Sequence, residues 1–344
     1  MRPARPQVNS LPASPQHWQA ELARGFREPG QLLAALGLTA ADCGLAPGAA
    51  AAFPLRVPRG FVARMRPGDP RDPLLLQVLP APDEALTAPG FVSDPVGDLD
   101  SVRTPGLLQK YSGRALLVAT GACAVHCRYC FRRDYPYGEH SAAAGHLESA
   151  LEAIAGDPSL EEIILSGGDP LVLADHRLEA VVNALDDLPH VRRIRLHTRV
   201  PVVLPERVDA RLLRFLGNLR TRIVVVIHAN HPRELADPVV AGLRALGAAT
   251  GPVLNQSVLL RGINDSPEAI IDLSRGLFEA GVMPYYLHQM DRVSGAAHFA
   301  VADEEARRLI AAAMEALPGY LVPRLVREVP GAPSKTLLGS FGAT

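Results

Sequence analysis

The feature that most limits the fold is a regular alternation of short apolar runs with longer helical patterns, which begins near residue 115. Six runs have the length and composition of buried strands, and they lie at 115–120, 162–168, 192–199, 222–230, 252–260 and 283–290. Helical patterns separate them. Because strands that alternate with helices pair in parallel, the alternation predicts a parallel α/β sheet, either doubly wound or curled into a barrel.

The helical patterns that follow these strands are amphipathic. The clearest lie at 174–188, 206–219, 268–281 and 302–317. In the last of them apolar residues recur at three- and four-residue steps, which places them on one face: Ala306, Leu309, Ile310, Ala313, Met314 and Leu317.

The positions of the polar residues favour a barrel. Every strand ends in, or carries, side chains that can do chemistry: the cysteine loop after the first strand, then 166–169, 197–199, 228–231, 255–257 and 288–291. In an α/β barrel the carboxyl ends of the strands converge on one mouth, so these groups can face a single cavity. We therefore predict an α/β fold built on a partial (β/α)6 TIM-like barrel that is open on one side.

The change from an irregular pattern to alternating strands and helices divides the chain into three regions. Residues 1–105 form an irregular, mainly helical extension, with one or two short helices within 17–38 and with Cys43 as a buried structural thiol. The barrel occupies 106–300, and 301–344 hold the last helix and a C-terminal segment.

Composition narrows the functional classes. The formal net charge is -1 and 48% of the residues are hydrophobic, so nothing indicates a surface for nucleic acid or for an anionic membrane. The N-terminus lacks the apolar run of a secretory signal, and no stretch is long enough to span a membrane, so we expect a cytoplasmic protein. In that compartment the four cysteines are expected to be free, catalytic or metal-bound.

Three of the cysteines, Cys123, Cys127 and Cys130, have the spacing C-x3-C-x2-C in the loop after the first strand. A structural zinc site needs a fourth ligand, and no second cysteine or histidine pair is present. His126 directly precedes Cys127 and cannot easily bend back onto the same ion, so we interpret it as a loop residue. A four-iron cluster held by three thiolates leaves one iron open to a small ligand.

With Tyr129 before the last cysteine, this motif resembles that of the radical S-adenosylmethionine (SAM) superfamily. The resemblance implies a 4Fe-4S cluster on the three cysteines, with SAM bound at the open iron and cleaved by one electron to a 5′-deoxyadenosyl radical. It also implies that SAM is contacted by Tyr129 and by the segment after the second strand: Ser166, Gly167, Gly168 and Asp169. The alternative from another class is a zinc or iron-sulfur module without turnover.

Further segments, in order from about residue 100 to the end, resemble the lysine 2,3-aminomutase family. They read "YSGR", "CRYCFRR", "SGGDPL", "HTRVPVVLPERV", "HANHPRE", "NQSVLLRGIND", "PYYLHQMD" and "PGAPSK". The resemblance implies pyridoxal 5′-phosphate (PLP) as a second cofactor, with Lys335 as its Schiff-base lysine and with Tyr111, Arg114 and Gln256 among the residues that bind it. The chain has only one other lysine, Lys110, which we expect to be a surface charge.

The same resemblance implies a substrate site. Arg132 matches the arginine that pairs with the substrate carboxylate, while Arg128 and Arg133 beside it are expected to be structural. Asp291 and Glu328 match the two acids that hold the far end of the substrate. Two carboxylates in one pocket favour an ammonium group and repel a carboxylate, so lysine fits better than glutamate.

The chain departs from the longer aminomutases in three ways. Glu328 stands where they carry Asp; Ala332, Pro333 and Ser334 replace their Gly-rich approach to the PLP lysine; and no cysteine follows Cys130, so their C-terminal zinc site is absent.

This short form is similar to bacterial enzymes that make (R)-β-lysine for elongation factor P. The resemblance implies an isomerase that converts L-α-lysine to (R)-β-lysine for that factor and its lysine ligase, with flavodoxin or ferredoxin as reductant. The alternatives are a catabolic lysine 2,3-aminomutase or an aminomutase for glutamate or another amino acid. A homo-oligomer is compatible with the sequence.

Overall fold

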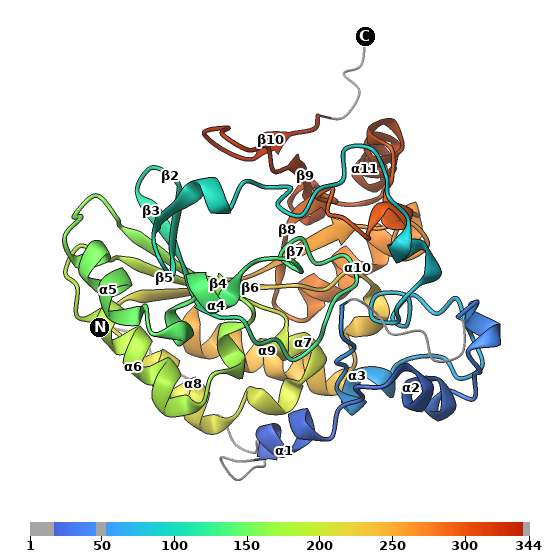
Figure 1. The fold of residues 1–344 in the computed structure, drawn as a ribbon, viewed down its shortest axis with the longest axis horizontal. Coiled ribbons are helices and arrows are strands. Elements are labelled where there is room, and N and C mark those ends of the chain that lie inside the picture. The colour runs from blue at the N-terminus through green and yellow to red at the C-terminus, as the bar shows by residue number, and fades with distance from the viewer. Residues whose placement is uncertain (1–16, 46–52, 340–344) are drawn as a thin grey trace.

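The computed structural model describes residues 17–45 and 53–339, and they form one curved sheet with helices packed outside it (Figure 1). The sheet has ten strands in sequence order. Their bounds are β1 (Val102–Thr104), β2 (Leu107–Tyr111), β3 (Arg114–Thr120), β4 (Glu162–Gly167), β5 (Arg193–Thr198), β6 (Arg222–Ile227), β7 (Val253–Leu259), β8 (Met283–Gln289), β9 (Arg324–Arg327) and β10 (Thr336–Leu337).

The six predicted strands are confirmed as β3 to β8, and all neighbours among them pair in parallel. β9 adds a seventh parallel strand beside β8, whereas β1, β2 and β10 pair antiparallel at the two ends of the sheet. The first and last strands do not pair with each other, so the barrel is partial, as predicted.

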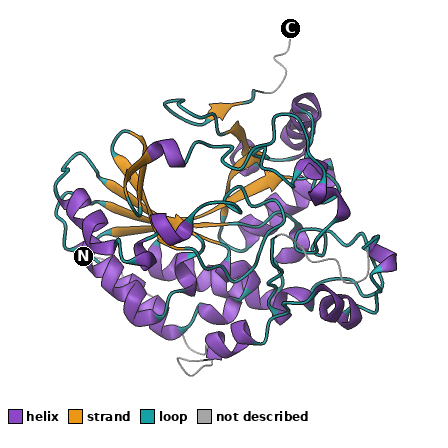
Figure 2. Ribbon diagram, viewed as in Figure 1, coloured by secondary structure: helices purple, strands orange, loops and turns teal. Residues whose placement is uncertain are grey.

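The longer helices lie on the convex side of the sheet (Figure 2). The helices after β3 to β8 are α4 (Tyr137–His140), α5 (Leu147–Ala155), α6 (Asp175–Asp186), α7 (Val200–Val203), α8 (Ala210–Asn218), α9 (Asp237–Thr250), α10 (Pro267–Glu279) and α11 (Asp303–Ala316). Local capping sets where the longer ones begin. The Asp209 carboxylate accepts from Leu212 N at the start of α8, and the Ser266 hydroxyl does so from Ala269 N at the start of α10.

Strand β5 shows how the sequence separates the two faces of the sheet. Ile194 and Leu196 are fully buried against the helices. Arg193, Arg195 and His197 alternate with them and are only partly buried, on the concave side. The convex side therefore holds the hydrophobic core, and the concave side is free to carry chemistry.

The apolar face of α11 is narrower than its periodicity suggests. Ala306, Leu309, Ile310 and Ala313 are buried, but Met314 is 55% exposed. Met314 therefore lies at the edge of this face.

The N-terminal extension is helical and irregular, as predicted. It contains α1 (His17–Ala23), α2 (Pro29–Ala35) and α3 (Arg59–Val62), and Trp18 of α1 is buried over the guanidinium of Arg207. Cys43 is only partly buried, because it ends a short 3-10 turn at the edge of the core. The prediction of a buried thiol is therefore wrong, although burial still raises the pKa of Cys43.

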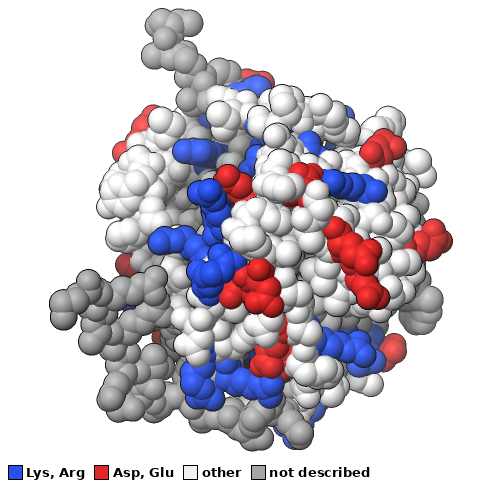
Figure 3. All heavy atoms as spheres, turned by 90° about the vertical axis from the view of Figure 1, so that its left-hand side faces the viewer, with Lys and Arg blue, Asp and Glu red and all other residues white. Residues whose placement is uncertain are grey.

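The surface carries mixed charge on the face shown in Figure 3, where basic and acidic side chains lie next to one another among uncharged residues. No helix in the described ranges is long and apolar enough to cross a membrane. The boundaries at residues 105 and 300 stay predictions.

Candidate active site

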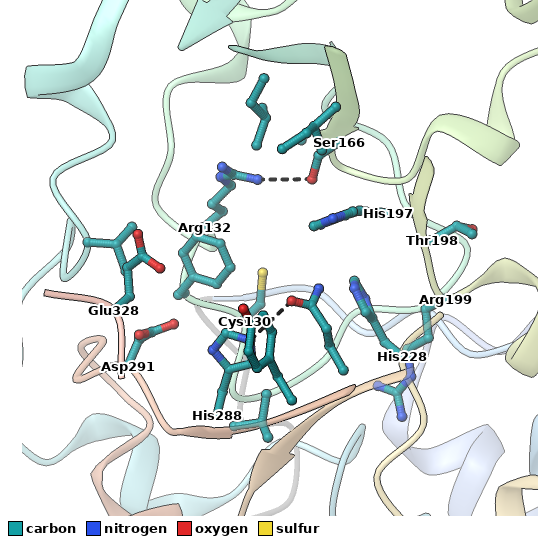
Figure 4. Close-up of a pocket in the computed structure, with 18 of the residues that line it drawn as sticks. Cys130, Arg132, Ser166, His197, Thr198, Arg199, His228, His288, Asp291 and Glu328 are labelled. Atoms are coloured by element: carbon teal, nitrogen blue, oxygen red, sulfur yellow. Dashed lines mark hydrogen bonds between the residues drawn. The ribbon is translucent and has the colours of Figure 1, made fainter. Parts of the chain in front are cut away.

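A cavity of about 490 Å³ lies on the concave side of the sheet. It is lined by every residue that the sequence singled out for cofactor, metal or substrate: Tyr111, Arg114, Cys123, Cys127, Tyr129, Cys130, Arg132, Ser166, Gly167, Gly168, Asp169, Gln256, Asp291, Glu328 and Lys335. In Figure 4, Asp291 and Glu328 lie together at one side of the view, and His197 and His228 at the other. The fold thus brings together residues that are more than 200 positions apart in the sequence.

The three cysteine thiols are free and partly buried in the loop between β3 and α4. Burial raises the pKa of Cys123 and of Cys130, the latter to about 11, and the charge of the neighbouring thiols adds to the rise. Within the described ranges no group of three or more His, Cys, Asp or Glu side chains is arranged to hold a metal ion. The assignment of an iron-sulfur cluster therefore does not rest on the positions of the side chains but on the cysteine motif.

The N-terminal extension holds this loop in place. The carboxylate of Glu84 accepts from Arg128 Nε at 2.7 Å and from Arg133 Nη2 at 2.9 Å, and Arg128 is fully buried. His126 Nδ1 lies 3.0 Å from the carbonyl oxygen of Pro54, away from the thiols. These contacts agree with the structural interpretation of the two arginines and of His126.

The Gly-Gly pair at the end of β4 makes a close backbone contact with the cysteine loop. A Cβ at Gly168 would lie 2.2 Å from the carbonyl oxygen of Ala122, and Gly167 has a φ of +108°. Only glycine fits at either position, because there is no space for a Cβ at Gly168 and because Gly167 has a backbone conformation in the left-handed region. The pair keeps the segment after β4 against the start of the cysteine loop.

The Asp169 carboxylate is engaged in hydrogen bonds with other groups of the chain. Its carboxylate accepts from Thr198 Oγ1 at 2.7 Å and from the backbone N–H groups of Leu171, Arg199 and Val200. Burial raises its pKa even though these donors favour the charged form. Asp169 therefore ties the end of β4 to the end of β5, and its predicted contact with SAM stays a prediction.

At the other end of the cavity Glu328 is shared by two donors. Tyr111 Oη and Lys335 Nζ each lie 2.5 Å from one of its carboxylate oxygens. Burial pushes the pKa of Glu328 up, but the charge and hydrogen bond of Lys335 outweigh it and bring the pKa below its usual value. Burial raises the pKa of Asp291 to about 7, and the negative charge of Glu328 contributes to that rise.

Arg132 is held by an acid that sequence reasoning missed. Its Nε donates to Asp98 Oδ2 at 2.6 Å, and its Nη1 donates to Ser166 Oγ at 3.2 Å. The other oxygen of Asp98 lies 2.7 Å from Lys110 Nζ. Lys110 is therefore not a surface charge, because it lines the cavity and its side chain is only 20% exposed. The sequence did hold one signal that Lys110 has a role, because the chain has only two lysines.

Three histidines, His197, His228 and His288, line the same cavity. Burial lowers the pKa of all three, and that of His228 falls to about 4, so the rings are neutral near pH 7. His288 Nε2 lies 3.1 Å from Gln256 Oε1, and His197 Nε2 is buried with no hydrogen-bond partner among the described residues. The strand-end pattern indicated these positions without assigning them a role.

Comparison with known proteins identifies the family. Residues 117–274 match the model of the radical SAM superfamily. The L-lysine 2,3-aminomutase of Escherichia coli K12 is 46% identical over 329 residues, which cover 94% of this chain and 95% of that protein. The Haemophilus influenzae L-lysine 2,3-aminomutase is 42% identical, again covering 94% and 95%.

More distant matches differ in length or sequence. The L-lysine 2,3-aminomutase of Clostridium subterminale is 33% identical over 80% of this chain but only 66% of its own length. A crystal structure of Streptococcus suis SuiB bound to S-adenosylmethionine has a TM-score of 0.48 at 14% identity, over 64% of this chain and 51% of that chain.

The high identity to the two short bacterial relatives extends over nearly their whole length. The radical SAM match also spans the strands that carry the cysteine loop and the Gly-Gly segment. The chain is therefore an enzyme of the L-lysine 2,3-aminomutase family, a family of radical SAM isomerases with a 4Fe-4S cluster and SAM.

Proposed function

We propose that this enzyme converts L-α-lysine to (R)-β-lysine with PLP as a second cofactor. The observation that carries the proposal is that one cavity holds the three thiols, the Lys335 amine with its two acids, and the cation Arg132. This rearrangement needs a radical source, an amine that binds the PLP aldehyde, and groups that hold both ends of the substrate.

The residues present fit a cluster and SAM. The thiols of Cys123, Cys127 and Cys130 are free and line one cavity. A four-iron cluster is larger than one ion, so its thiolates stand further apart than the ligands of a single metal. The positive charge of the irons would also offset the burial and the thiolate repulsion that raise the pKa of Cys123 and Cys130.

PLP also fits the residues at the other end. Lys335 supplies the amine, and its Nζ lies 6.0 Å from the centre of the Tyr286 ring. The Arg114 guanidinium lies over the Tyr111 ring at 4.8 Å, and its Nε is buried without a hydrogen-bond partner in the described part of the chain. A guanidinium with a donor still free is suited to a phosphate. When bound, PLP supplies an electron sink and carries the amino group.

The choice of lysine as substrate is supported by the acids. Glu328 already binds an ammonium group in this structure, that of Lys335, and Asp291 lies near enough for the charge of Glu328 to raise its pKa. A second carboxylate on the substrate would be repelled here, whereas the ε-ammonium of lysine is attracted. Arg132 remains for the α-carboxylate, with its Nε held by Asp98.

A product assay tests the proposal. Anaerobically reconstituted enzyme, with SAM, PLP and a one-electron reductant, is given L-lysine or L-glutamate, and the products are separated by chromatography. We expect β-lysine from lysine and almost no β-glutamate. Lys335→Ala should lose PLP absorbance and activity but keep its iron. β-Glutamate as the main product would refute the substrate assignment, and a colourless protein that takes up zinc would refute the cluster.

We further propose that the β-lysine modifies elongation factor P. The proposal is supported by the match to the Escherichia coli relative, which covers 94% of this chain and 95% of that protein. The enzyme, lysine, the lysine ligase and elongation factor P should together increase the mass of the factor by one β-lysyl group. If the factor accepts α-lysine equally well, the catabolic alternative is favoured. The flavodoxin or ferredoxin reductant, a cytoplasmic location and a homo-oligomer stay predictions.

A further inference from the structure

A buried guanidinium at the end of β5 reaches the cysteine loop that follows β3. Arg199 directly follows β5, and its side chain is 5% exposed. Its Nη1 donates to Cys127 Sγ at 2.8 Å and to Tyr129 Oη at 2.7 Å. Among the arginine side chains that the structure describes, that of Arg199 alone donates a hydrogen bond to a cysteine sulfur. Sequence reasoning assigned it no role.

A network of buried groups fixes the orientation of this guanidinium. Nη2 of Arg199 donates to Gln77 Oε1 at 2.5 Å and to Glu234 Oε2 at 3.0 Å. Glu234, which is fully buried, also accepts from Gln77 Nε2 and from the N–H of Asn230. The backbone N–H of Arg199 is bound by Asp169 at 2.7 Å. The side chain therefore has little freedom to leave the sulfur.

The guanidinium stays charged in this position. A guanidinium keeps its proton under all conditions in which proteins fold. Glu234 balances the charge of Arg199 within the network. Negative charge that is added at Cys127 therefore meets a buried donor whose position is fixed.

We infer that Arg199 is a positioning residue that sets the reduction potential of the cluster through its hydrogen bond to Cys127. The inference rests on the cluster that the proposed function places at these cysteines. In the step concerned, the cluster gains one electron from an external low-potential donor. No bond forms or breaks at Cys127, and the hydrogen stays on Arg199. A hydrogen bond to a ligating sulfur stabilises the more negative, reduced state.

Potentiometry of three variants tests this role. Arg199→Gln removes the charge, and Arg199→Lys keeps it but loses the planar fork. Arg133→Gln is the matched control, because Arg133 lies beside the same loop and bonds to Glu84 and to the carbonyl oxygen of Arg128, not to a sulfur. Each protein is reconstituted with iron and sulfide, its iron is counted, and the reduced cluster is titrated by electron paramagnetic resonance without lysine or PLP.

We expect Arg199→Gln to keep its iron and to have an equilibrium constant for reduction about tenfold lower, the size of one hydrogen bond to a charged group. Arg199→Lys should fall between it and the wild type, and Arg133→Gln should match the wild type. An Arg199→Gln protein with full iron and an unchanged potential would overturn the inference.

If Arg199→Gln does not hold iron, Arg199→Lys decides the question. A lowered potential with full iron supports the inference, whereas an unchanged potential, or loss of iron in both variants, shows a purely structural role and overturns it. Because neither lysine nor PLP is present, the result does not depend on the aminomutase activity. A wild-type protein that takes up no iron would instead refute the proposed cluster.

Discussion

At the scale of single residues, one acid in this cavity binds two basic side chains. The buried carboxylate of Asp98 faces two cations, with Arg132 Nε at 2.6 Å and Lys110 Nζ at 2.7 Å. One negative charge between two positive ones leaves this part of the cavity positive, which suits a carboxylate ligand. Asp98 therefore both orients Arg132 and keeps Lys110 inside the cavity.

We predict that Asp98→Asn raises the KM for lysine about tenfold, because Arg132 loses the charged acceptor at Nε that fixes its orientation. The effect on kcat should be smaller. Asp100→Asn is the control, since Asp100 is a nearby exposed acid. Steady-state kinetics of the reconstituted enzymes provides the measurement. Equal KM values for Asp98→Asn and the wild type would show that Arg132 does not need this acid.

Asp291 gives a pH dependence. Its pKa of about 7 is set by burial first, is raised further by Glu328 and Asp98, and is lowered by Lys335 and Lys110. Because the charged form binds an ammonium group, kcat/KM for lysine should rise with pH through about 7. Asp291→Asn should lose this rise. A pH–rate profile of both enzymes makes the comparison, and the same rise in the variant would exclude Asp291 as its source.

Ionisation of Asp291 affects stability in the opposite direction: it favours lysine binding but lowers the free energy of unfolding. The folded pKa of Asp291 lies above the ordinary value of 3.8, so the wild type loses stability as pH rises from about 4 to 7. Asp291→Asn should therefore gain stability relative to the wild type between pH 5 and 8. Urea unfolding at these two pH values measures the change, and a constant difference between the two proteins would contradict it.

At the scale of elements, the predicted alternation was sufficient for β3 to β8 because each is a run of six or seven residues that alternates with amphipathic helices. It missed β9 and β10, which have only four and two residues. β9 is recognisable only by its pairing with β8, and β10 only by its pairing with β9. These two short strands flank the segment that carries Glu328 and Lys335, so their pairing brings both residues to the cavity.

The turn after β4 gives a prediction at this scale. Gly168→Ala would place a Cβ 2.2 Å from a backbone oxygen of the cysteine loop, so we expect a loss of about 3 kcal/mol in unfolding free energy. Gly138→Ala in α4 is the control, since a Cβ there meets nothing within 4 Å and a helix favours alanine. Denaturant unfolding monitored by circular dichroism should separate the two variants. Equal stabilities would mean that the loop moves freely away from Gly168.

At the scale of the whole molecule, the cysteine loop belongs to the barrel but is also bound by the N-terminal extension. Gln77 accepts Arg128 N–H through its backbone oxygen, and Glu84 binds the guanidinium groups of Arg128 and Arg133. The extension is thus part of the wall behind the cluster motif.

We predict that Glu84→Gln lowers the unfolding free energy by about 3 kcal/mol and reduces iron uptake, because it leaves two cations without their acid near the cysteine loop. Asp83→Asn, which changes the exposed neighbouring acid, should do neither. Thermal unfolding and iron content after reconstitution are the measurements. Full iron uptake by Glu84→Gln would show that the loop holds its shape without the extension.

Sequence alone was enough to predict the parallel α/β barrel, the three thiols and the resemblance that selected Lys335, Arg132, Asp291 and Glu328. It could do so because strand periodicity and short motifs are local properties of the chain. It placed Lys110 on the surface and gave no role to Asp98, Gln77 or Glu234. The side chains that bind their side chains lie 12 to 157 positions away. Only the tertiary structure decided these pairings, because burying a charge is costly without a partner and the partner comes from whichever segment the fold places beside it.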